Sequence, residues 1–178
     1  MRKQFAFGCA ALAVVLALGG AGCRRHKVAV RDTDEAPGRL RSVVDMSDPR
    51  TAGQLLSGFH SLEEGAWRWT AREFSVNLAR PPEAAQKGAT LTVRLTVPPV
   101  SIEKLKSLKL SAAVNGGPLD PETYTSPGNY VYRRELPPSL LRDDPVRVDF
   151  SLDKAIPPGN PDVRELGLVV LSIGLQTR

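Results

Sequence analysis

The chain has 178 residues and a net charge of +5 at pH 7, which fit one globular domain of modest basic character. Two cysteines and two histidines argue against a zinc site, which needs three or four ligands from Cys, His, Asp and Glu. The glycine-rich motifs that bind nucleotide phosphates are missing as well, so we expect neither a metal nor a cofactor.

Residues 1–22 have the composition of an export signal. Arg2 and Lys3 precede an uncharged stretch whose apolar part spans residues 5–18 and ends in small residues. A charged start, a short apolar segment and small residues are typical of secretory signal peptides. The apolar run is at the short end for a membrane-spanning helix, which needs about 20 apolar residues. The sequence therefore predicts export and removal of residues 1–22.

Cys23 directly follows the small residues Ala21 and Gly22, and this stretch resembles the bacterial lipobox. The resemblance implies that Cys23 receives diacylglycerol and further acyl chains such as palmitate, although Gly20 stands where the pattern usually has Leu. Cys9 leaves with the signal, so Cys23 becomes the sole thiol and cannot form an internal disulfide. The alternatives are an unmodified cysteine after an ordinary signal and an uncleaved anchor.

Residues 23–54 are predicted to form the lipidated N-terminus and a flexible tether, because they are polar and lack periodicity. Their basic cluster, Arg24, Arg25 and Lys27, either contacts anionic headgroups or is simply solvated. A nucleic-acid binder gathers its basic residues on one face of its domain, so no nucleic-acid partner is expected. Arg24 is not the Asp that retains some lipoproteins in the inner membrane, which favours the outer membrane.

Residues 55–178 are predicted to form an all-β domain, an antiparallel β-sandwich of about seven or eight strands. Apolar and polar residues alternate in residues 74–78, 91–97, 108–114 and 146–152. Such alternation places one set of side chains in the core and the other in water. Residues 67–70 and 130–134 are also strand-like, and the apolar run at 166–175 predicts a central strand. One or two helical turns are expected at residues 101–107.

Chemistry-bearing residues are sparse in this domain. Glu63-Glu64 and Asp143-Asp144 are sequence neighbours, and neighbours in an extended chain point to opposite faces. His60 is the domain's single histidine, and no nucleophile motif accompanies it. We therefore expect a non-catalytic domain. An enzyme that draws two carboxylates from separate strands remains an alternative.

Two aromatic pairs are candidates for a ligand platform. Trp67 and Trp69 are two residues apart, as are Tyr130 and Tyr132, so each pair shares one face of a strand. Coplanar aromatic rings on a sheet can stack on the apolar faces of sugar rings. The alternative is that one or both pairs fill the core.

Residues 58–70, Gly-Phe-His-Ser-Leu-Glu-Glu-Gly-Ala-Trp-Arg-Trp-Thr, resemble the opening of a jelly-roll-like β-sandwich domain. That domain occurs alone in small bacterial envelope proteins of unknown function and fused to glycosyltransferases and related polysaccharide enzymes. Asn115-Gly116 and residues 164–168 fit the same pattern, so the resemblance covers about residues 58–175. It implies a jelly-roll-like fold and a context of envelope glycans, and it carries over no catalytic residues.

Together these features predict a lipid-anchored envelope lipoprotein whose non-catalytic β-sandwich binds a glycan or a protein partner. One alternative is an envelope glycan-processing enzyme or accessory protein. Another is a structural lipoprotein whose sandwich edges recruit a partner by strand addition.

Overall fold

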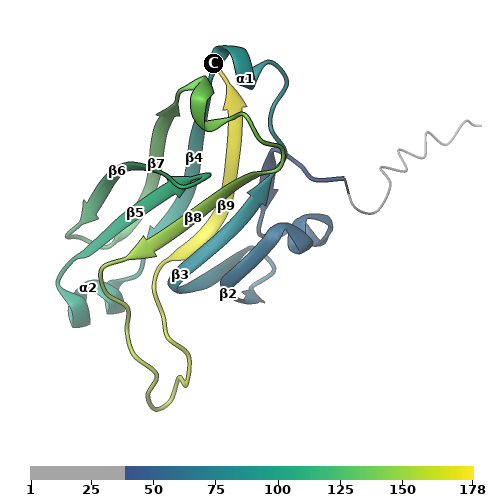
Figure 1. Cartoon of the computed structure of the whole chain (residues 1–178). Helices are drawn as coiled ribbons and strands as arrows, with labels where there is room; N and C mark the ends of the chain where they lie inside the picture. Colours follow the sequence, from purple (N-terminus) through teal and green to yellow (C-terminus); the bar gives the residue numbers. More distant parts are fainter. Residues whose placement is uncertain (1–38) are drawn as a thin grey trace, which may run out of the picture. The chain divides into compact units, whose positions relative to one another are not determined.

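Nine antiparallel strands dominate residues 39–178, the part of the chain that this computed structural model describes (Figure 1). Cys23, Arg24, Arg25, Lys27 and the export signal lie outside the described residues. The strands are β1 (Val43–Asp45), β2 (Leu55–Glu63), β3 (Trp67–Leu78), β4 (Ala89–Val97), β5 (Leu108–Val114), β6 (Gly117–Tyr124), β7 (Gly128–Leu136), β8 (Val146–Leu152) and β9 (Val169–Thr177).

The strands form two layers that join at β3. Hydrogen bonds follow the path β6-β5-β8-β3-β9-β4-β7, with β2 added to β3 and β1 added to β9. The first residues of β3 pair with β9, whereas residues 73–78 pair with β8. We call β2-β3-β8-β5-β6 the five-stranded layer and β1-β9-β4-β7 the four-stranded layer. Without β2, the chain visits the two layers in the order of a jelly roll, so the expected fold class is confirmed.

The core lies between the layers and is built from the apolar members of the alternating runs. Leu91, Val93 and Leu95 on β4 are at most 1% exposed, and the same pattern recurs on β5 and β8. The apolar run near the C-terminus forms β9, which pairs with β4 along one edge and with β1 and β3 along the other. Its central position agrees with the burial of Val170, Ile173 and Leu175.

Three strands differ from the sequence prediction. The strands expected at residues 67–70 and 74–78 are one strand, β3, which spans both layers. β2 is hidden in the sequence because its pairing with β3 shifts register at several points. β6 is hidden because it carries Pro118 and Pro121, which are tolerated only at a sheet edge, where β6 lies.

The sequence pattern places residues 43–54 in the tether, whereas the structure places them in the fold. β1 pairs with β9, and Val44 and Met46 are buried in the core. The 3₁₀ helix Pro49–Gln54 follows, and the buried Gln54 side chain donates to the carbonyl oxygens of Arg41 and Asn77. The folded part therefore begins before residue 55.

Helices are short in the described chain. α1 spans Ala84–Lys87, α2 spans Pro99–Leu105, and a second 3₁₀ helix spans Pro138–Leu140. α2 corresponds to the turns expected at residues 101–107 but begins at Pro99, because proline is well tolerated in the first helical turn. Within residues 39–178, no helix has the length and hydropathy to span a bilayer. Residues 39–178 lie in one compact unit with its own core, as expected of a part that folds alone.

Candidate functional site

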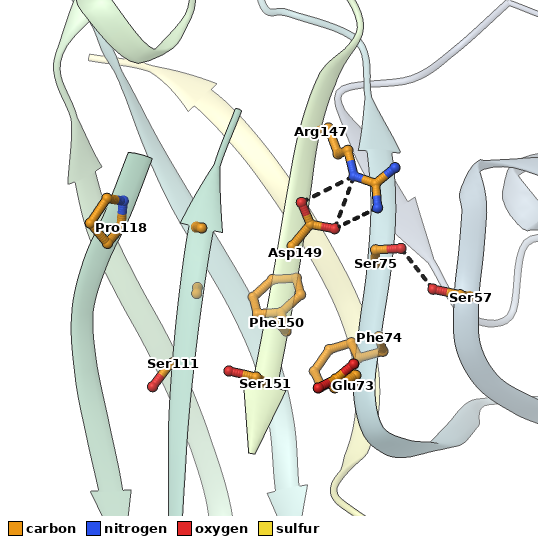
Figure 2. Close-up of a pocket in the computed structure, with 12 residues that line it drawn as sticks. Ser57, Glu73, Phe74, Ser75, Ser111, Pro118, Arg147, Asp149, Phe150 and Ser151 are labelled. Atoms are coloured by element: carbon orange, nitrogen blue, oxygen red, sulfur yellow. Dashed lines mark hydrogen bonds and ion pairs between the residues drawn. The ribbon is translucent and has the colours of Figure 1, made fainter. Parts of the chain in front are cut away.

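A hollow of about 420 Å³ opens on the outer face of the five-stranded layer (Figure 2). It is open to solvent, and we call it the serine hollow. The polar residues that line it come from β2, β3, β5 and β8, and they are Ser57, Glu73, Ser75, Ser111, Arg147, Asp149 and Ser151. On β3, β5 and β8, core residues alternate with residues on the opposite face of the strand. The side chains on that opposite face point outward into the hollow.

Strand register brings the lining residues into two parallel rows. One row crosses all five strands and consists of Ser57, Ser75, Asp149, Ala113 and Pro118. Four strand spacings of roughly 4.8 Å give this row a length of about 19 Å. Most of its members have small side chains, which leaves a depression along the middle of the sheet.

The second row consists of Glu73, Ser151 and Ser111 on β3, β8 and β5. Glu73 and Ser151 are both exposed, so their polar atoms are open to a ligand. Together, the two rows line the depression with hydroxyl and carboxylate groups. Hydroxyls both donate and accept hydrogen bonds, whereas ionised carboxylates only accept them.

Two fixed interactions orient the polar groups of the hollow (Figure 2). Arg147 Nη2 lies 2.8 Å from Asp149 Oδ1, and Arg147 Nε donates to the same oxygen at 2.9 Å. These hydrogen bonds raise the pKa of Arg147. The hydroxyls of Ser57 and Ser75 are 2.8 Å apart. Glu73, by contrast, has no ion-pair partner among residues 39–178.

The floor of the hollow is apolar. The rings of Phe74 and Phe150 stack with centroids 4.7 Å apart, and both residues are at most 3% exposed. They belong to the core and reach the hollow from below. No tryptophan or tyrosine lines it, so a ligand there would be held mainly by hydrogen bonds.

The predicted tryptophan platform lies elsewhere. Trp67 and Trp69 are half-buried and lie outside the core cluster. Register places Trp69 in a row with Val169, Thr96 and Asn129, which runs across the outer face of the four-stranded layer. Neither tryptophan lines the serine hollow. A ligand role for this pair stays a prediction that is separate from the hollow.

The predicted tyrosine platform is wrong for Tyr132. Its side chain is fully buried, and its hydroxyl donates to the carbonyl oxygen of Asp120 at 2.9 Å. Burial raises the pKa of this phenol. Tyr130 is half-buried, packs on the Tyr124 ring at 4.7 Å and donates to the carbonyl oxygen of Ser126 at 3.0 Å. The physical reason is that this face of β7 is turned toward the core.

The stretch at residues 58–70, which carries the family resemblance, forms most of the β2–β3 hairpin and is held by polar contacts. His60 Nε2 lies 2.7 Å from the carbonyl oxygen of Glu165, and Arg164 donates to Glu63 at 2.6 Å. Arg164 also pairs with Asp162 and lowers the pKa of that carboxyl to about 2. These contacts tie the hairpin to the β8–β9 connection. His60 therefore has a structural role in the described chain.

The serine hollow is absent from the sequence prediction. Its signal is present, since Ser75, Ser111, Asp149 and Ser151 are the polar members of predicted strands. Alternation identifies them as outward-facing but cannot say which of them are neighbours. Among residues 39–178, no group of three or more His, Cys, Asp or Glu side chains is arranged to hold a metal ion.

Searches of protein-family models and of curated proteins match nothing to this chain. One solved structure that it resembles is a family GH115 4-O-methyl-α-glucuronidase with specificity for decorated arabinogalactans. The TM-score is 0.52 at 11% identity, over 80% of this chain and 18% of the enzyme. The chain thus corresponds to less than a fifth of that enzyme's length, and the likeness shows the fold alone.

Carbohydrate-binding modules are also among the matched structures. A family 35 module from Clostridium thermocellum is 12% identical over 75% of this chain and 96% of the module, with a TM-score of 0.45. The CBM36-1 domain of a multidomain xylanase, from the hindgut metagenome of Trinervitermes trinervoides, is 10% identical over 74% and 94%, with a TM-score of 0.36.

Proposed function

We propose that this chain is a non-catalytic, glycan-binding β-sandwich that lipid on Cys23 holds at the cell envelope, in the outer membrane. The observation that carries the binding role is the serine hollow, whose hydroxyl and charged groups lie along an open depression of the sheet. The observation that supports the anchor is the Cys23 sequence context.

The hollow suits sugar hydroxyl groups. Each hydroxyl of a sugar both donates and accepts, and it can match a serine hydroxyl, a carboxylate or a guanidinium. The Arg147–Asp149 pair offers a donor and an acceptor side by side, held in place by their mutual contacts. An open depression along a row of about 19 Å suits a chain of sugar rings better than a small enclosed molecule.

The same geometry favours binding over glycan hydrolysis. Glycosidases place two carboxyl groups on either side of the scissile bond. In the serine hollow, Glu73 and Asp149 stand on neighbouring strands and project from the same face of one sheet. Asp149 is also held by Arg147, which favours its ionised form. This arrangement lines one side of a ligand and does not flank a bond.

A bulky substitution in the middle of the hollow tests the proposal. Ala113 lies in the centre of the long row, next to Asp149 and Pro118, so Ala113→Trp would fill the depression. Thr92→Trp is the matched control, because Thr92 points outward from the four-stranded layer. The soluble protein of residues 34–178 is applied to an array of neutral and acidic polysaccharides.

We expect Ala113→Trp to weaken binding at least tenfold and Thr92→Trp to leave it unchanged, with both variants folded by circular dichroism. Absence of binding to any polysaccharide contradicts the proposal. Binding that survives Ala113→Trp but is lost in Trp67→Ala and Trp69→Ala would place the glycan on the tryptophan pair instead of the hollow.

A further inference from the structure

We infer that the serine hollow takes an uncharged polysaccharide chain lying across the strands, and that it rejects chains bearing carboxylate or sulfate groups. The inference rests on the glycan-binding function proposed above and names the ligand class of the same site. Two observations carry it, namely the balance of charge in the hollow and the direction of its rows.

The charge of the hollow is negative where a ligand would lie. Its lining contains one cation, Arg147, whose Nε and Nη2 are both engaged by Asp149. Glu73 is exposed and has no ion-pair partner in the described part of the chain. An anionic sugar would therefore meet a lining with two carboxylates and one cation, and like charges at close range repel.

The cations nearest to the hollow on β5 and after β8 lie outside its lining. Lys109 lies two residues before Ser111 on β5 and shares its face. It stands opposite Asp153: the Asp153 backbone N–H donates to the Lys109 carbonyl oxygen, and the Lys109 backbone N–H donates to the Asp153 carboxylate. The Asp153 carboxylate also lies 4.0 Å from Lys154 Nζ, and neither Lys109 nor Lys154 lines the hollow.

The rows set the direction of the chain. The row from Ser57 to Pro118 runs across the strands for about 19 Å, whereas the longest polar series along one strand, from Arg147 to Ser151 on β8, covers about 13 Å. A ligand that lies across the strands therefore spans a longer part of the hollow than one that lies along β8. Because no exposed aromatic ring anchors a single sugar, the affinity should depend on how many sugars lie in the row.

The experiment compares a polysaccharide with its own charged derivative. β-Glucan, galactan and xylan are titrated into the 34–178 protein by calorimetry. The tightest of these neutral chains that carries primary hydroxyls is then selectively oxidised at those hydroxyls to carboxylates and titrated again. We expect the oxidised chain to bind at least tenfold more weakly. We also expect the affinity for oligosaccharides of the neutral chain to rise with length and then level off once the row is filled.

Charge reversal at Glu73 provides the matched variants. Glu73→Lys should raise the affinity for the oxidised chain at least tenfold more than it raises the affinity for the neutral chain. Glu73→Gln should give a smaller gain. Equal or tighter binding of the oxidised chain, still abolished by Ala113→Trp, overturns the neutral-ligand inference while the glycan-binding function stands. No binding of any chain overturns the proposed function itself.

Discussion

Gly58 lies where β2 passes very close to β3. Its φ of +74° is in the left-handed region, and a Cβ atom there would lie 1.9 Å from the carbonyl oxygen of Glu73 and 2.7 Å from the Cα of Phe74. Both atoms belong to the backbone and cannot move aside without breaking the β3–β8 pairing. The first glycine of the family-like stretch is therefore required by packing.

We predict that Gly58→Ala lowers the free energy of unfolding by at least about 3 kcal/mol, because strain and overlap add together. Gly65 is the matched control, since its φ is +67° but nothing lies within 4 Å of a Cβ there. Gly65→Ala should cost about 1 kcal/mol from backbone strain alone. Urea unfolding of the 34–178 protein measures both, and equal losses would contradict the argument from close approach.

At the scale of elements, β6 and β7 close one side of the sandwich through side chains. Arg134 on β7 donates to the carbonyl oxygens of Asp120 and Pro121 at 2.7 and 3.1 Å, and it pairs with Glu122 at 3.2 Å. Its guanidinium also lies 4.1 Å from the centroid of the Tyr132 ring. One side chain thus connects the edge strands of the two layers.

We predict that Arg134→Ala destabilises the protein by about 2 kcal/mol, because it removes charge-assisted hydrogen bonds from a partly buried site. Arg133 is the control, since it is exposed and its side chain makes no hydrogen bond or ion pair within the described chain. Arg133→Ala should change stability by less than about 0.5 kcal/mol. Chemical denaturation of both variants gives the comparison, and a difference near zero would refute the connecting role of Arg134.

Three edge strands, β1, β2 and β6, are poorly suited to strand addition, which is not the role that we propose. β1 has three residues, β2 shifts register repeatedly, and β6 carries two prolines. Short edges, irregular edges and prolines are features that prevent an edge from pairing with another chain. The outer faces of the layers are therefore better recruitment surfaces than these three edges.

For the whole molecule, the anchor and the fold are predicted to be separable. The nine strands and the core of the described part are built from residues 39–178, so we expect Cys23→Ser to leave this part folded. We expect this substitution to abolish incorporation of labelled palmitate and to release the protein from the membrane fraction, since stable anchoring takes more than one acyl chain. Palmitate incorporation that persists in the variant would rule out Cys23 as the lipidated residue.

The sequence by itself determined most of the strands, because alternation is a local property with a period of two residues. The runs that became β4, β5 and β8 and the central position of β9 could all be read in advance. Alternation could not assign the buried face at residues 130–132, where three aromatic or apolar residues follow one another. There, the structure leaves Val131 56% exposed and buries Tyr132 completely.

Only the tertiary structure decided where the candidate site lies. Ser57, Ser75, Ala113 and Asp149 come from four strands that are distant in sequence, and they become neighbours through the register of those strands. Register depends on long-range pairing and core packing, which one strand's pattern does not contain. The sequence therefore indicated that a sandwich forms and which side chains face outward, while the fold alone brought the hydroxyls and charges of the serine hollow together.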